Sequence, residues 1–151
     1  MSEHTLPHTG VLTGVSQAAR EALTQYGTFS SRPKNSTIVE QGGPANFLHL
    51  VVSGELQVTL RTPDELVPFG YVHDGETVGE MGFMEPGAIA SAAVTTAVAS
   101  VVWSISAEDF DTFLHSHPAA GCEILKAILR LVGRRARKGN KRLADEIEEQ
   151  G

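Results

Sequence analysis

Residues 75–81 read Gly75-Glu76-Thr77-Val78-Gly79-Glu80-Met81, and the fold prediction begins from this stretch. Its residue types and spacing are typical of a strand end followed by a turn. The Glu80 carboxylate could form short, strong hydrogen bonds with a ligand hydroxyl, or it could be a solvated turn acid.

Short β-rich runs separated by turn residues extend on both sides of this stretch, from Thr28 to Ile105. Many short strands at this spacing predict a sandwich, a barrel or a jelly roll. The runs that we expect to form strands are residues 37–39, 47–52, 56–60, 69–73, 92–99 and 101–105.

Helical patterns flank the β-rich region. Residues 11–26 place apolar residues at helical spacing after a polar segment, 1–10, that we expect to be a flexible tail. Ser106 resembles a helix cap, and Pro118 can open a long last helix. We expect that helix to break near Gly139-Asn140, since glycine weakens helices. The last helix carries an apolar stripe formed by Ile124, Leu125, Ile128, Leu131 and Val132.

The length of 151 residues predicts a single domain over residues 11–151. One cysteine permits no intramolecular disulfide, and no signal or membrane-spanning pattern is present, so we expect a cytoplasmic protein that does not bind membranes. The net charge of −6 is unevenly distributed. Residues 62–125 contain no lysine or arginine, residues 126–142 carry +8, and residues 143–151 carry −4.

Three blocks in order resemble the cyclic nucleotide-binding domain family, including its catabolite-activator branch. They are residues 35–54 with their glycine turns, residues 75–81, and the Ser106 cap with the two helices that follow. The resemblance covers roughly residues 14–143. It implies an antiparallel β-roll (a double-stranded jelly roll) over about 28–105, with an N-terminal helix and C-terminal helices over about 107–148.

The second block resembles the start of the family's phosphate-binding cassette, and we call residues 79–92 the cassette. The resemblance implies that Glu80 accepts the ribose 2′-hydroxyl and that Gly79 lets the backbone approach the sugar. A short helix over 81–84, which includes Met81 and Gly82, would then direct its amides at the phosphate.

The cassette departs from the family at the position of the arginine that pairs with the cyclic phosphate. That position is Ala90, followed by Ser91 and Ala92, and on a shorter family spacing it is Ile89. Loss of one charge-assisted hydrogen bond predicts cAMP or cGMP affinity that is weaker by about ten- to a hundredfold.

Three other arginines could replace the missing charge. Arg61 ends a predicted strand, and Arg130 and Arg134 lie on the last helix one turn apart. The alternative is that each is an exposed surface charge, which is the more common role of such residues.

The sequence therefore predicts a stand-alone regulatory domain that senses a nucleotide-like small ligand, with weak or lost cAMP and cGMP binding. A ligand-free protein-interaction module is an alternative, and a cupin-like metal enzyme is a distant one. His49 and His73 lie far apart, and no catalytic set or metal-ligand set stands out, so we expect no enzyme activity and no certain cofactor.

Two partner predictions follow from the last helix. We expect a homodimer through its apolar stripe. We expect no DNA binding, because no helix-turn-helix follows in the sequence and the basic run 126–142 is typical of a solvated or ion-paired face. The sequence does not identify the ligand or a protein partner.

Overall fold

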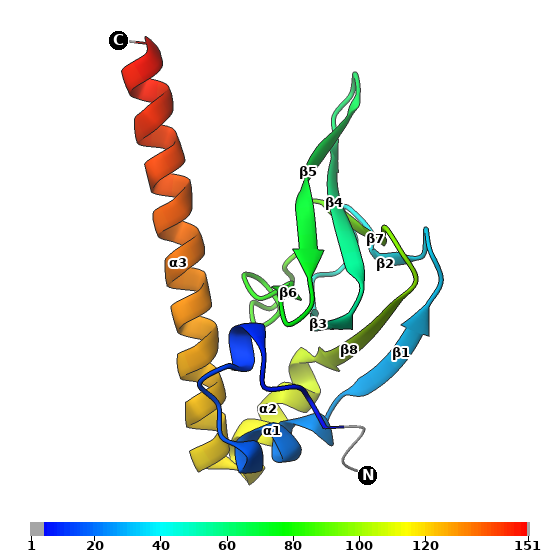
Figure 1. The fold of residues 1–151 in the computed structure, drawn as a ribbon, viewed down its shortest axis with the longest axis vertical. Coiled ribbons are helices and arrows are strands. Elements are labelled where there is room, and N and C mark those ends of the chain that lie inside the picture. Colours follow the sequence, from blue (N-terminus) through cyan, green and yellow to red (C-terminus); the bar gives the residue numbers. More distant parts are fainter. Residues whose placement is uncertain (1–4, 151) are drawn as a thin grey trace.

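The computed structural model describes residues 5–150. Two antiparallel four-stranded sheets form a β-roll, with strand orders β1-β8-β3-β6 and β2-β7-β4-β5 (Figure 1). The predicted mainly-β roll with flanking helices is confirmed. The strands are β1 (Thr28–Arg32), β2 (Thr37–Val39), β3 (Phe47–Ser53), β4 (Glu55–Arg61), β5 (Leu66–His73), β6 (Thr77–Val78), β7 (Ala93–Thr96) and β8 (Ser100–Ser106).

Two strands were not among the predicted runs. β1 pairs with β8 over its whole length, and β6 pairs with β3 through only two residue pairs. A two-residue strand has no alternation of its own that a sequence pattern could reveal. β6 ends directly before Gly79, so its pairing with β3 sets the position of the cassette.

The N-terminal helix is shorter than predicted. It is α1 (Gln17–Thr24), preceded by a 3-10 turn over Gly10–Leu12, so the expected helix over residues 11–26 is wrong in extent. Ser16 is the reason, because its side chain accepts a hydrogen bond from the Ala19 N–H at 3.2 Å and starts a new helix there.

The predicted tail over residues 1–10 contains a core residue. Leu6 is completely buried, and its N–H donates to the Thr24 hydroxyl at 3.0 Å. The description of this segment as a loose tail therefore does not hold at Leu6. Residues 1–4 lie outside the described residues.

Two helices follow the roll, α2 (Ala107–Ser116) and α3 (Pro118–Gln150). The Ser106 cap is confirmed, since its side chain accepts from the Asp109 N–H at 3.0 Å. The predicted break at Gly139-Asn140 is wrong, because α3 continues through it. A single glycine costs only about 1 kcal/mol in a helix, and the flanking Lys, Arg, Leu and Ala residues favour helix.

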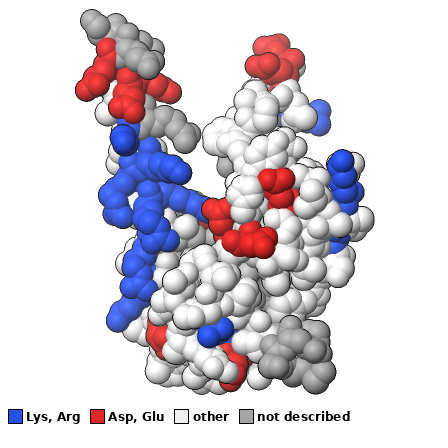
Figure 2. Space-filling view, in the orientation of Figure 1, with Lys and Arg blue, Asp and Glu red and all other residues white. Residues whose placement is uncertain are grey.

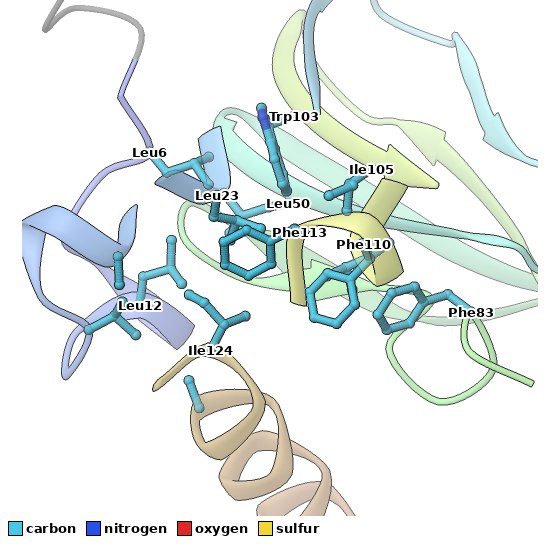
Figure 3. Close-up of a cluster of buried hydrophobic side chains, with 14 residues drawn as sticks. Leu6, Leu12, Leu23, Leu50, Phe83, Trp103, Ile105, Phe110, Phe113 and Ile124 are labelled. Carbon is cyan, nitrogen blue, oxygen red and sulfur yellow. The ribbon is translucent and has the colours of Figure 1, made fainter. Parts of the chain in front are cut away.

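The largest core cluster joins the helices to one sheet of the roll (Figure 3). Phe110 and Phe113 of α2 lie at its centre with Ile124 of α3, all almost completely buried. Phe83, from the cassette, packs edge-on against Phe110 with ring centroids 5.2 Å apart. The cassette is thereby attached to the helical layer as well as to the roll.

His49 on β3 gives the fold a pH dependence. Its Nδ1 lies 2.7 Å from the Ser104 hydroxyl, and its ring stacks on Phe47. Burial, together with the nearby Arg32 charge, lowers the pKa of His49 from 6.5 to about 4. The imidazole of His49 is therefore neutral in the folded protein between pH 4 and 6.5, whereas in the unfolded chain it is protonated over the same range.

The stability that the neutral His49 allows is fully present above pH 6.5. As the pH falls from 6.5 towards 4, the free energy of unfolding drops by on the order of 2–3 kcal/mol, because protonation of His49 stabilises the unfolded chain. We expect the His49→Gln variant, which keeps a hydrogen-bonding group for Ser104, to show a smaller loss. Urea denaturation of both proteins between pH 7.5 and 4 measures the difference. Parallel stability curves for the two proteins would contradict the assignment.

Candidate ligand-binding site

Gly79 connects β6 to the cassette through a conformation that requires glycine. Its φ is 91°, and a Cβ at this position would lie 2.4 Å from the Phe47 carbonyl oxygen. The close approach in the structure is to β3, and the approach of the Gly79 backbone to a ribose stays a prediction. This turn directs the chain so that the next residue, Glu80, points into the molecule, where its side chain is 3% exposed.

Glu80 forms an ion pair with Arg135 of α3. The same guanidinium donates to the Thr77 carbonyl oxygen at 3.0 Å, and the Thr77 hydroxyl donates to Glu80 at 3.4 Å. Burial lowers the pKa of Arg135, while the neighbouring Glu76 carboxylate raises it. Glu80 is thus a buried carboxylate with a partner, and the solvated-turn alternative is wrong for this residue.

Arg135 was not among the arginines selected from the sequence. Arg134 is exposed, and Arg61 is exposed at the end of β4, where its N–H bonds to Gln41. Arg130 is exposed, and its guanidinium lies near Gly14, at 3.9 Å from the position that a Cβ on this glycine would occupy. Among the described residues, the lysine or arginine that forms an ion pair with the cassette is Arg135.

The helical spacing of the apolar residues on α3 does not identify it. Ile124 and Ala127 are buried in the large core cluster, and Leu131 is half-buried. Arg134 and Arg135 follow Leu131 by steps of three and four residues, so the spacing alone admits either residue on this helix face. In the structure, Arg135 is half-buried and pairs with Glu80, whereas Arg134 is exposed.

Residues 80–87 form turns rather than a helix, so the predicted helix over 81–84 is wrong. The N–H groups of Gly82 and Phe83 both donate to the Gly79 carbonyl oxygen, at 3.3 and 3.0 Å. Pro86-Gly87 ends the turn, and φ at Gly87 is 78°. Met81 is 70% exposed and Gly82 is half-buried.

Ala90 is held by the glycine turn that precedes β3. Its N–H donates to the Gly43 carbonyl oxygen and its carbonyl oxygen accepts from the Gly42 N–H, both at 2.8 Å. Ala90 and Ala92 are half-buried, and Ser91 between them is exposed. The position expected for the phosphate arginine is therefore well anchored by its backbone and carries a methyl group.

The charges on the two sides of the site are opposite. Figure 2 shows basic side chains along α3 and acidic side chains on the part of the roll that faces it. At the cassette itself, Glu76 and Glu80 face Arg135. The local groups thus carry a net charge of about −1 at neutral pH, without counting Glu85 on the exposed turn.

Residues 5–150 lack the features of two other classes of site. No helix there is long and apolar enough to cross a membrane. The same residues contain no group of three or more His, Cys, Asp or Glu side chains arranged to hold a metal ion.

Comparisons with known proteins agree with this fold. A protein-family model described as "Cyclic nucleotide-binding domain" matches residues 30–117. The "CRP-like cAMP-activated global transcriptional regulator" of Mycobacterium tuberculosis is 29% identical over 146 residues, which cover 94% of this chain and 62% of the regulator. The Escherichia coli "cAMP-activated global transcriptional regulator CRP" is 31% identical over 88 residues, covering 57% of this chain and 41% of that protein.

Solved structures show the same fold at lower identity. A cyclic nucleotide-binding domain from Methylobacillus flagellatus superimposes with a TM-score of 0.78 at 23% identity, covering 87% of this chain and 74% of that one. The catabolite activator protein of Thermus thermophilus has a TM-score of 0.77 at 19% identity, covering 90% and 62%. Since the family model matches more than half of the chain, and the roll, the cassette turn and the helices have the expected order, this chain belongs to the cyclic nucleotide-binding domain family.

Proposed function

We propose that this chain is a regulatory domain that senses a nucleotide-like small ligand at the cassette and binds cAMP and cGMP weakly or not at all. One observation carries the proposal. The buried Glu80 is present and oriented by α3, while the anchored position 90 carries alanine. The bacterial relatives named above are cAMP-activated regulators, which supports a regulatory role over an enzymatic one.

The Glu80–Arg135 pair supplies a route from the ligand to the last helix. A ligand hydroxyl that donates to Glu80 would share the carboxylate with Arg135 and change the contact between the cassette and α3. Such a ligand shifts the equilibrium between two positions of α3, and the size of the shift equals the difference in its binding free energy for the two positions. Binding at the cassette and the state of α3 are therefore expected to be coupled.

Calorimetric titration with cAMP and cGMP tests the affinity prediction. We expect no submicromolar binding, since the missing arginine costs about ten- to a hundredfold. A submicromolar Kd for either nucleotide would contradict the prediction. In that case, separate alanine variants of Arg61, Arg130, Arg134 and Arg135 would identify the residue that supplies the charge.

A ligand-free protein-interaction module remains the second candidate. It is favoured by the fact that Glu80 already has a partner, so the cassette and α3 are connected without a ligand. Thermal denaturation with and without candidate ligands separates the two, because a ligand at 100 times its Kd adds about 2.7 kcal/mol of stability. The cupin-like alternative has no support from the described residues. We propose a cytoplasmic location.

Dimerisation through α3 is also part of the proposal, with a face that keeps Leu125 of the predicted stripe (46% exposed) and leaves out Ile124 and Ile128. Ile128 packs against the core of its own subunit, and Ile124 is buried there. The apolar side chains left exposed on α3 include Leu129 (71% exposed) and Leu143 (57% exposed). They lie fourteen residues apart, which places them on one face of a helix with a seven-residue repeat.

The Leu129→Asp/Leu143→Asp double variant is therefore expected to be monomeric with an unchanged circular dichroism spectrum. Leu66→Asp, at an exposed leucine of β5, is a matched control that should stay dimeric. Light scattering coupled to size-exclusion chromatography measures the mass of each protein. An unmodified protein that is monomeric at high concentration would rule out the dimer.

A further inference from the structure

The cassette offers few groups to an anion. Residues 62–125 include no lysine or arginine, so the cassette turns themselves supply no cation. The guanidinium of Arg135 is the cation that reaches the site, and it is engaged by Glu80 and the Thr77 carbonyl oxygen. A cyclic phosphate would therefore add a negative charge beside two carboxylates and one neutralised guanidinium.

Several N–H groups of the cassette backbone are already hydrogen-bonded within the protein. Anion sites in proteins commonly use free N–H groups at a turn or at a helix N-terminus. Here, the N–H groups of Gly82 and Phe83 are bonded to Gly79, and the N–H of Ala90 is bonded to Gly43. The N–H groups of Glu85 and Ala88 likewise donate to the carbonyl oxygens of Gly82 and Glu85, so these five cassette amides already have partners within the protein.

The groups that remain suit a hydroxyl better than a phosphate. A hydroxyl both donates and accepts hydrogen bonds, whereas a phosphate diester only accepts. The Glu80 carboxylate is an acceptor, and the Arg135 guanidinium next to it is a donor with N–H groups beyond those used here. A vicinal diol could donate to Glu80 through one hydroxyl and accept from Arg135 through either oxygen.

We infer that the cassette site takes an uncharged ribosyl ligand, of the nucleoside class, in preference to the corresponding cyclic nucleotide. The inference rests on the proposed ligand-sensing function and specifies its ligand class. The diol binds at the Glu80–Arg135 pair, and the part of the site that would face a phosphate stays without a charge partner.

Calorimetric titration with two matched pairs of probes tests this: adenosine against cAMP, and guanosine against cGMP. Within at least one pair, the nucleoside is expected to bind at least tenfold more tightly than its cyclic nucleotide. Its Kd should change little between 50 and 500 mM NaCl, because an uncharged ligand has no ion pair for salt to screen. Replacing the nucleoside that binds by its 2′-deoxy form should lower the affinity at least tenfold.

Two variants locate the binding. Glu80→Gln should weaken nucleoside binding at least tenfold, whereas Glu85→Gln, at an exposed acid of the same turn, should leave it unchanged. Tighter binding of the cyclic nucleotide in both pairs would overturn this inference and leave the ligand-sensing function standing. Absence of binding by all four probes, in a protein that is folded by circular dichroism, would overturn both and favour the ligand-free module.

Discussion

Replacement of Arg135 by alanine is expected to lower the free energy of unfolding by about 2–4 kcal/mol, near the range for removing one partner of a buried ion pair. The physical reason is that Glu80, with a side chain only 3% exposed, would lose the cation that pairs with its buried carboxyl group. The Thr77 carbonyl oxygen would lose its donor as well. We place the value towards the low end because the Arg135 side chain is 37% exposed, so water can partly replace it.

The two partners should not be equivalent. Glu80→Gln leaves a guanidinium that can turn towards solvent, so it should cost less than Arg135→Ala. The double variant should cost less than the sum of the two single variants, since the contact is already lost after the first substitution.

Arg134→Ala is the matched control, because Arg134 is the neighbouring residue on the exposed side of α3. It should change stability by no more than about 0.5 kcal/mol. Urea denaturation gives these values, and hydrogen exchange along α3 should show that its middle turns open more often in Arg135→Ala. Equal effects of the Arg134 and Arg135 substitutions would mean that the ion pair contributes no stability.

Introducing Ala90→Arg is expected to raise cAMP affinity at least tenfold while leaving the adenosine affinity nearly unchanged. A guanidinium at this position would supply the charge-assisted bond that the cyclic phosphate lacks, which is worth about 1.5–3 kcal/mol. The backbone hydrogen bonds of Ala90 to Gly42 and Gly43 do not depend on the side chain, so the turn should persist.

Ile89→Arg controls for the added charge. Ile89 is exposed and precedes Ala90, so an arginine there has the same charge in a different direction. Glu80→Ala in the Ala90→Arg background should remove the gain, since the ribose contact would be lost. Calorimetric titration measures each affinity. A gain in Ile89→Arg alone would place the phosphate position one residue earlier, and no gain in a folded Ala90→Arg protein would show that the site is closed to cyclic nucleotides.

The sequence alone was sufficient to predict a fold of many short strands, the Ser106 cap and the start of the last helix at Pro118, and its resemblance to the family implied the β-roll. These features depend on residues that are neighbours along the chain, such as an alternating strand, a glycine in a turn or a serine before an acidic helix start. The sequence also showed that position 90 carries no cation, because no lysine or arginine occurs in residues 62–125.

The tertiary structure decided which arginine meets Glu80. The contact between Thr77 and Arg135 joins residues 58 positions apart in the chain. Its identity depends on the rotation of α3 about its own axis, which is set by the packing of Ile124 and Ala127 against the core. A rotation of about 100° separates consecutive residues of a helix. Arg134 and Arg135 therefore look alike in the sequence, although only Arg135 faces the roll, where burial makes its charge a partner for Glu80.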